Sequence, residues 1–590
     1  MKLNPCLIAA MIVVLLQVTA SGQVTYTAVS SAGWNSASTW SPAGIPGAAD
    51  TAIIPAGTTV TYNGMPATLG TILISGTFSP SSPGTLGNVW VAATGSFNVT
   101  GSAANLTFNG SVTNLGTMPI GSFGSGTIFT YAGTNQFLAG NISNVIANIT
   151  GSYQNLGTFV VGLKGTQNCL KGTGTLTNSG MLVLGSGQNT APTVPLDSSA
   201  VGSLVMWTNF NGTATLPTAT YYDVFIGQVG TSGWNIGTAN IIHNLILVGA
   251  APIGTWPANG AIGGRVTYGT SSTTASTLPA AFSVGGFVQS SGKVIIPAGG
   301  TLTVTGGAGC WNQTGGILTA GTGGTVKFTG STPGIGNIAV NNLLLDTPVT
   351  DATIGTGLSV TNNLTIPAGA TLDVTALPAG SYTMLGTESL MNGGTISGSV
   401  VTVSGSQVSA GGNGAYGTGT FTGSLSLAAG SAVNLDVNNS AGSPNDELVV
   451  NGALTLNNNT FNINPPSAGA SLDAANDYVL VTAASISGSP VLHWTTTPAD
   501  TNYSLVVSAT QIRLHNNAAV TTSRPTLNFG LSGQTLTISW NSTTYSGFTL
   551  YEETNLENGA WIPVANGNVS PVTIQVDPTL AGCYFRLSNL

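Results

Sequence analysis

Short apolar runs alternate with Gly, Asn, Ser and Thr along most of this chain. From about Gln23 to Thr420 each run holds only a few residues, and Val, Ile, Leu and Thr dominate the runs. Residues of this kind favour strands, whereas the intervening Gly, Asn and Ser favour turns. The pattern therefore predicts an all-β region made of many short strands.

Recurring phrases indicate how these strands are organised. An Asn-x-Gly phrase begins at Asn114, Asn155 and Asn178. The intervals between these positions are close to multiples of about 20 residues, a repeat typical of solenoids. A second phrase, Pro-Ala-Gly before a strand, ends at three glycines: Gly57, Gly299 and Gly369. We therefore expect a right-handed parallel β-helix at residues 23–420, in which each turn buries apolar side chains against the next and Asn side chains form amide ladders.

The pattern changes towards the C-terminus. Residues 421–515 are expected to hold the terminal turns of the β-helix, and the polar residues 516–525 predict a linker. After it, about five strands alternate with turns and carry more aromatic and charged residues, a pattern typical of antiparallel sheets. Residues 526–590 therefore predict a small antiparallel β-sandwich.

Residues 1–22 predict a signal peptide. Lys2 is followed by the apolar run Leu7–Leu16 and by small residues that end at Ala20, the three parts of a secretory signal. The apolar run is too short to span a bilayer, and no later run reaches the length of about 18 apolar residues that a membrane helix needs. We expect a secreted mature chain without a transmembrane segment.

Charged residues make up only 4% of the chain, against about 25% in an ordinary soluble domain. There is no Asp or Glu from Thr51 to Leu196, and none from Val224 to Leu345. The basic residues of the middle region are isolated, so they cannot neutralise a row of phosphates. Nucleic acid is therefore not an expected partner.

Few residues are available for catalysis. Glycoside hydrolysis needs two carboxylates across the scissile bond, and Asp197 and Asp223 are the only acids between Asp50 and Asp346. A cleft that joins both with Lys171 would indicate an enzyme, whereas as turn residues they are structural. The three histidines lack metal-site spacing. We expect no enzymatic activity, no cofactor and no metal site.

Two acidic pairs leave calcium binding open as an alternative to a turn that caps a strand. Asp446 is followed by Glu447, and Asp473 and Asp477 lie four positions apart. Carboxylate oxygens are the ligands that Ca²⁺ prefers, but neither pair belongs to an EF-hand loop. The turn is the default interpretation of both pairs.

Three cysteines remain after the signal peptide. Because the number is odd, at least one of Cys169, Cys310 and Cys583 is unpaired within the chain. Cys169 and Cys310 are predicted to be small buried apolar residues. A disulfide among the three stays an open alternative.

Two segments carry a resemblance to known proteins. The N-terminal phrase with Trp34, Trp40, Pro46 and Asp50 resembles the opening of many secreted bacterial β-helix proteins, and residues 427–456 resemble the end of autotransporter-associated β-strand repeat proteins, here without a C-terminal membrane barrel. The resemblance implies an N-terminal cap in which the two Trp and the Pro pack on the first turn and the Asp ends a turn. It also implies a secreted or surface location and an adhesive or structural role, and it names no catalytic residues.

Aromatic residues are the candidates for ligand binding, because an exposed ring can stack on a sugar. The alternative is that they fill the core. The candidate ligand-binding residues are Trp207, Trp234, Trp256, Trp311, Tyr551 and Trp561.

The sequence thus predicts a secreted or cell-surface β-helical protein with a non-enzymatic structural or adhesin-like role. The expected partners are extracellular polysaccharides or components of the cell envelope. The alternative function is an extracellular β-helix protein that binds or degrades polysaccharide. A groove with clustered acids and a base would favour the degrading form of the alternative.

Overall fold

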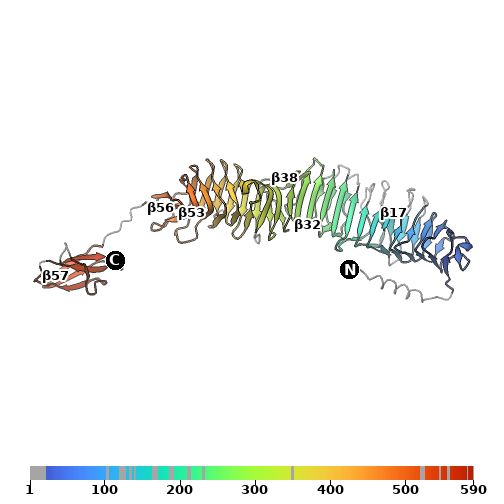
Figure 1. The fold of residues 1–590 in the computed structure, drawn as a ribbon, viewed down its shortest axis with the longest axis horizontal. Coiled ribbons are helices and arrows are strands. Elements are labelled where there is room, and N and C mark those ends of the chain that lie inside the picture. The colour runs from blue at the N-terminus through green and yellow to red at the C-terminus, as the bar shows by residue number, and fades with distance from the viewer. Residues whose placement is uncertain are drawn as a thin grey trace. The chain divides into compact units, whose positions relative to one another are not determined.

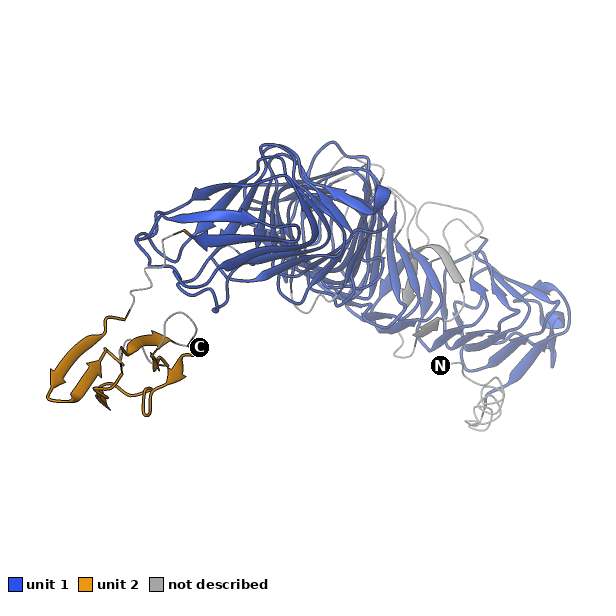
Figure 2. Cartoon of the chain, turned by 60° about the vertical axis from the view of Figure 1, so that its left-hand side comes forward, with its two compact units in different colours: residues 1–516 blue, residues 517–590 orange. Residues whose placement is uncertain are grey.

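The protein is described from a computed structural model. The described residues are 22–100, 105–118, 128–131, 136–138, 141–161, 170–184, 192–208, 214–228, 233–250, 252–346, 351–412, 414–517, 525–543, 547–554, 559–580 and 582–588. The chain divides into two compact units, unit 1 (residues 1–516) and unit 2 (residues 517–590) (Figure 2). The predicted signal peptide lies outside the described residues apart from residue 22, and so does most of the predicted linker.

Unit 1 is a parallel β-solenoid, in which strands of successive turns pair side by side (Figure 1). Its first sheet runs in the order β3 (Trp40–Ser41), β1 (Thr25–Ala28), β4 (Thr51–Ile54), β7 (Thr71–Ile74), β10 (Val89–Val91), β13 (Val112–Asn114), β16 (Gln136–Leu138), β18 (Ser152–Asn155), β21 (Thr175–Asn178) and β23 (Leu196–Asp197). Later turns continue a parallel ladder through β36 (Thr301–Val304), β39 (Thr325–Phe328), β40 (Gly334–Leu345), β41 (Ala352–Ile366), β44 (Ser389–Asn392), β47 (Gln407–Ala410), β50 (Ala432–Asp436), β52 (Thr460–Asn464) and β54 (Val491–Trp494). The predicted parallel β-solenoid is confirmed.

The core of unit 1 is a column of inward side chains. Along β22 (Met181–Leu184) the burial alternates, so that Leu182 and Leu184 are buried and Met181 and Val183 are half-buried. The same alternation occurs in β18 and β21, as expected where one face of a pleated strand points inward. Stacking the turns therefore joins the inward residues into one apolar core.

A buried amide ladder crosses three turns of the solenoid. Asn155 Nδ2 donates to Asn178 Oδ1 at 2.7 Å, and Asn178 Nδ2 donates to Ser198 Oγ at 2.9 Å. Asn114 pairs with Leu138, which pairs with Asn155, so the interval from Asn114 to Asn155 spans two turns. The predicted ladder is confirmed at Asn155 and Asn178, and Leu138 separates Asn114 from it.

The three glycines of the Pro-Ala-Gly phrase adopt a left-handed backbone. Their φ angles are 80° at Gly57, 65° at Gly299 and 82° at Gly369. Residues with a Cβ rarely adopt this conformation. The phrase therefore marks the same tight backbone bend at three separate places along the solenoid.

The N-terminal end of unit 1 has the aromatic cap that the resemblance implies. Trp34 and Trp40 are buried, and their ring centroids lie 4.9 Å apart in an edge-to-face arrangement. Trp34 Nε1 donates to the Pro46 carbonyl at 3.1 Å. Asp50 Oδ2 accepts a hydrogen bond from the Gly47 N–H at 2.7 Å and so closes a turn.

An antiparallel hairpin closes the other end of the solenoid. It consists of β55 (Tyr503–Val507) and β56 (Gln511–Asn516), and β56 pairs antiparallel with β53 (Tyr478–Ser487). An open strand edge invites pairing with other chains. The hairpin therefore protects this edge of the last turns.

Unit 2 contains two three-stranded antiparallel sheets, as the sequence predicts. They are β57 (Asn528–Ser532), β58 (Thr535–Ser539) and β61 (Val572–Gln575), and β60 (Ile562–Pro563), β59 (Thr549–Glu553) and β62 (Tyr584–Ser588). Its small core consists of Ile538, Trp540, Leu550, Val564 and Val572. Across the described parts of both units, no helix has the length and apolar character needed to cross a membrane.

Candidate functional site

The four solenoid tryptophans predicted as ligand-binding residues lie in the core. Their exposed fractions are 0% for Trp207, 1% for Trp234, 3% for Trp256 and 0% for Trp311. Trp207 and Trp234 pack edge to face, with ring centroids 5.5 Å apart. An indole buried in this way cannot stack on a sugar. The ligand-binding interpretation of these four residues is therefore wrong, and they fill the volume of the solenoid core.

The two aromatic candidates of unit 2 remain partly exposed. Tyr551 belongs to β59, and Trp561 precedes β60 on the same sheet. The Arg586 guanidinium carbon lies 5.7 Å from the Tyr551 ring centroid and 4.5 Å from the Trp561 ring centroid. This cation–π contact covers one face of each ring. Sugar stacking on Tyr551 and Trp561 stays a prediction.

A trough of about 560 Å³ opens on the surface of unit 1. Its lining includes His243, Asn244, Arg265, Cys310 and three Gly-Gly pairs at residues 263–264, 285–286 and 306–307. The first two pairs lie inside the long strands β32 (Ala261–Thr270) and β34 (Ala281–Ser291), where the register of pairing shifts. The chain turns a corner at these glycines, and the corners of successive turns stack to form the trough.

The close approach of neighbouring turns explains why glycines stand at the corner. A Cβ at Gly263 would lie 2.2 Å from the Ile242 carbonyl oxygen, and a Cβ at Gly306 would lie 2.0 Å from that of Gly285. Gly307 differs, because the nearest atom to its Cβ would be the Thr332 carbonyl oxygen at 3.8 Å. The corner thus has no room for a Cβ at Gly263 or Gly306, whereas it has room for one at Gly307.

This difference gives a paired prediction. Gly306→Ala is expected to lower the free energy of unfolding of unit 1 by about 1–3 kcal/mol, because the new methyl group overpacks the corner. Gly307→Ala is expected to leave the free energy of unfolding unchanged within about 0.5 kcal/mol. Denaturant titration of both variants measures the difference, and equal effects at the two positions would contradict the packing argument.

Asp223 holds the His243 side chain from the preceding turn. His243 Nδ1 lies 2.8 Å from Asp223 Oδ1, which also accepts a hydrogen bond from the Asn244 N–H at 2.9 Å. The Tyr222 ring stacks on the imidazole at 4.4 Å. Asn244 Nδ2 also lies 2.9 Å from His243 Nδ1. Within the described residues, the hydrogen-bond contacts of the ring thus involve Nδ1, and Nε2 is the nitrogen left for a ligand. The sequence prediction of Asp223 as a turn residue misses this contact.

The Arg265 side chain is exposed but anchored. Its Nη2 donates to the Gly309 carbonyl at 3.1 Å, and its backbone N–H donates to Asn244 Oδ1 at 2.9 Å. A guanidinium carries five N–H donors, so most of them stay available to a ligand. Within the described ranges, no carboxylate forms an ion pair with Arg265.

Cys310 contributes a buried thiol to the trough lining. It is 3% exposed, and its Sγ lies 3.7 Å from the Gly334 carbonyl oxygen. Burial raises the pKa of the Cys310 thiol to about 11, so it is not a thiolate nucleophile at neutral pH. Cys310 is a small buried residue, as predicted. Cys583 is an exposed free thiol, and Cys169 lies outside the described residues.

Asp197 and Asp223, the two acids that would mark a degrading enzyme, have separate hydrogen-bond partners in the described part of unit 1. Asp197 Oδ1 accepts a hydrogen bond from the Ser199 N–H at 3.0 Å inside its own turn, as expected of a turn residue. Asp223 contacts His243 and Asn244. No described hydrogen bond or ion pair joins Asp197, Asp223 and Lys171.

The acidic pairs considered for calcium have protein partners. Asp446 is 2% exposed and accepts hydrogen bonds from two backbone N–H groups at 2.8 Å each. Asp473 Oδ1 accepts one from the Ala475 N–H at 3.0 Å, and Asp477 Oδ1 lies 2.7 Å from His515 Nδ1. Among the residues that the structure describes, no group of three or more His, Cys, Asp and Glu side chains could hold a metal ion.

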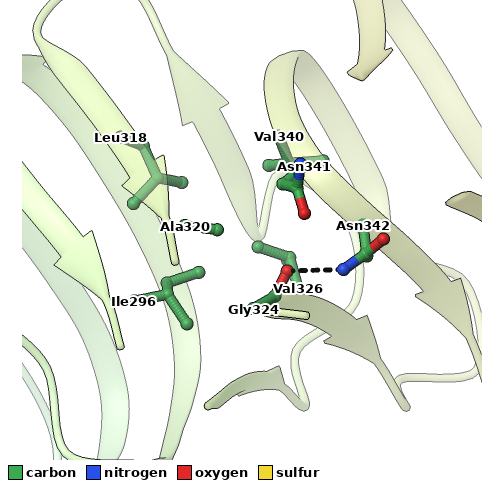
Figure 3. Close-up of a pocket in the computed structure, with 8 residues that line it drawn as sticks. All are labelled: Ile296, Leu318, Ala320, Gly324, Val326, Val340, Asn341 and Asn342. Carbon is green, nitrogen blue, oxygen red and sulfur yellow. Dashed lines mark hydrogen bonds between the residues drawn. The ribbon is translucent and has the colours of Figure 1, made fainter. Parts of the chain in front are cut away.

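A second hollow lies inside unit 1 and is shown in Figure 3. Aliphatic side chains on β35 (Lys293–Ile296), β38 (Ile317–Ala320), β39 and β40 form most of its lining. Asn342 Nδ2 donates to the Gly324 carbonyl at 2.9 Å beside it. The hollow has no room for a water molecule. It is therefore a packing gap between turns and not a ligand site.

Sequence reasoning missed the trough. The signal that marks it is the Gly-Gly pair that recurs at positions 263, 285 and 306, at intervals close to one turn of the solenoid. No family model matches the chain, and no curated protein matches it. The resemblance to autotransporter-associated β-strand repeat proteins therefore stays a prediction.

Proposed function

We propose that this protein is secreted or displayed at the cell surface and has a non-enzymatic structural or adhesin-like role. The observation that carries the proposal is the parallel ladder, which is repeated from β1 to β54 around a shared apolar core. Such a stack is held by backbone hydrogen bonds and apolar burial. It forms a repetitive scaffold, and the resemblance at both ends of the solenoid supports the same role.

Polysaccharide binding is the second candidate function. The trough favours it, because it presents an anchored guanidinium, an oriented imidazole and exposed backbone at one place. Degradation would further need a second carboxylate across the sugar bond. Asp223 contacts the trough residues His243 and Asn244, and its Oδ1 accepts a hydrogen bond from the Asn244 N–H. It is therefore the acid to replace in a test for degradation.

Cell fractionation and a turnover assay test the proposal. We expect the protein in the medium or on intact cells, and we expect no new reducing ends when it is incubated with a panel of polysaccharides. Recovery in the cytoplasm would overturn the location. Cleavage that Asp223→Asn abolishes would overturn the non-enzymatic role.

A further inference from the structure

We propose that the trough binds an acidic polysaccharide, with the Arg265 guanidinium donating hydrogen bonds to the carboxylate of one uronate unit. The proposal rests on the extracellular role proposed above and specifies the ligand class. It is carried by the local charge, by the anchored side chains and by the shape of the trough.

The Arg265 guanidinium is a positive charge in a region of the chain with few acids. The whole chain has a formal net charge of −8. From Val224 to Leu345 it has no acidic residue and three basic ones, Arg265, Lys293 and Lys327. The Lys327 ammonium forms an ion pair with Asp346, whereas Arg265 contacts a carbonyl. The Asp223 carboxylate contacts His243 at the edge of the trough, but no ion pair among the described residues joins a carboxylate to Arg265. The Arg265 guanidinium is therefore the group of the trough that favours an anionic ligand.

The geometry of Arg265 suits a carboxylate. The Gly309 carbonyl accepts from one terminal nitrogen of the guanidinium and so limits the rotation of the side chain. The remaining N–H groups form a planar fork, which matches the two oxygens of a carboxylate. Because Arg265 is the one basic residue of the lining besides His243, the site fits one carboxylate of the ligand.

His243 supplies a contact for a sugar hydroxyl group. Asp223 and the Tyr222 ring fix the imidazole, so His243 Nε2 meets a hydroxyl group with little loss of side-chain entropy. The Gly-Gly pairs of three turns leave room between the other lining side chains. Its volume of about 560 Å³ lies in the usual range for ligand sites, about 300–1,000 Å³. The open trough allows a polymer to lie across it.

The test uses the full mature chain and polygalacturonate, a polymer of uronate units, with the binding measured by calorimetry at low salt. Arg265→Gln is expected to weaken binding about tenfold or more, because a charge-assisted contact is lost. Lys293→Gln is the matched control, since it removes an exposed basic residue from β35, outside the trough lining. It is expected to change the affinity less than about twofold.

A second variant fills the trough instead of removing charge. Gly307→Leu is expected to abolish binding and to keep the fold, because Gly307 has room for a Cβ. Unchanged thermal unfolding of this variant shows that the fold is retained. If Gly307→Leu fails to fold, the paired Arg265 and Lys293 variants still decide the matter.

Several results would overturn the proposal. One is that Arg265→Gln binds polygalacturonate as tightly as the parent protein does. Another is that Lys293→Gln loses as much affinity as Arg265→Gln. A third is that the parent protein binds neutral galactan as tightly as polygalacturonate. Dextran sulfate carries sulfate groups instead of carboxylates. Tighter binding of dextran sulfate than of polygalacturonate would overturn the choice of a carboxylate as the ligand group. Release of cleaved sugars in the same incubation would contradict the proposed non-enzymatic function. Failure of the parent protein to bind polygalacturonate, without cleavage, would contradict only the proposal that the trough binds this ligand.

Discussion

Replacement of Trp311 by alanine is expected to lower the free energy of local unfolding of unit 1 by about 3–5 kcal/mol. Trp311 is fully buried in β37 (Trp311–Gln313), and its ring centroid lies 5.1 Å from that of Phe287 and 5.8 Å from that of Phe328. The parallel ladder fixes the backbone on both sides of the indole. The neighbouring turns therefore cannot collapse into the cavity that alanine leaves.

Hydrogen exchange of amides at residues 281–345 measures this effect, because a solenoid opens locally as well as globally. Trp311→Phe is expected to cost less than half as much. It keeps most of the apolar volume and removes an indole N–H that is buried without a hydrogen-bond partner. The half-exposed Trp561 provides the control, since Trp561→Ala should leave exchange in unit 1 unchanged. Exchange in Trp311→Ala equal to that of the parent protein would contradict the core assignment.

The burial of these tryptophans was accessible from the sequence, although ligand binding was predicted for them. Trp207 follows Val205 by two positions in β24 (Leu204–Thr208), and both are buried. Alternate residues of a strand share one face, so an aliphatic residue two positions away marks an aromatic residue as inward. Trp234 and Ile236 show the same relation.

The solenoid could be predicted because its turns repeat a simple chemistry of short apolar strands and Gly- or Asn-rich corners. Its register could not, because the turns differ in length. Thr325 pairs with Asn342 and Thr460 pairs with Val491, so the second of these turns is almost twice as long as the first. Insertions at the corners are tolerated in a solenoid, so no fixed period runs through the sequence. The trough depends on this register, which brings Asp223, His243 and Arg265 to successive turns.

Unit 1 is expected to lose stability as the pH rises from about 4 to about 8. Burial raises the pKa of the Glu388 carboxyl to about 7 and that of the Asp446 carboxyl to about 7. Both side chains are almost completely buried, with exposed fractions of 1% and 2%. A carboxyl whose pKa is higher in the folded chain binds its proton more tightly there. Its stabilising contribution is therefore complete below the pKa of the unfolded chain and is lost as the pH rises through about 7. The contribution is about 3 kcal/mol for Glu388 and about 4 kcal/mol for Asp446, at about 1.4 kcal/mol per pH unit.

Two carboxyls act in the opposite direction, Asp473 on unit 1 and Asp577 on unit 2, but at lower pH. Hydrogen bonds from Ala475 and Asn476 lower the pKa of Asp473, and hydrogen bonds from Thr579 lower that of Asp577. Such groups stabilise the fold above the pKa of the unfolded chain, and the stabilisation is lost as the pH falls through the lowered pKa. Their effect lies below about pH 4. It therefore does not mask the loss between pH 4 and pH 8.

Glu388→Gln tests the expectation, because glutamine keeps an acceptor for the Leu385 N–H and for the Tyr382 hydroxyl, which contact Glu388 Oε2 at 3.0 Å and 2.7 Å. Chemical unfolding of unit 1 should show the variant close to the parent protein at pH 4 and more stable at pH 8, because no charge then forms in the core. Asp577→Asn in unit 2 is the control for the loss of one acid, and its unit 1 profile should follow that of the parent protein. A parent profile that stays flat or rises between pH 5 and pH 8 would show that the buried carboxyls ionise without penalty. The buried surroundings of Glu388 would then have to admit water, which the close packing of a protein interior opposes.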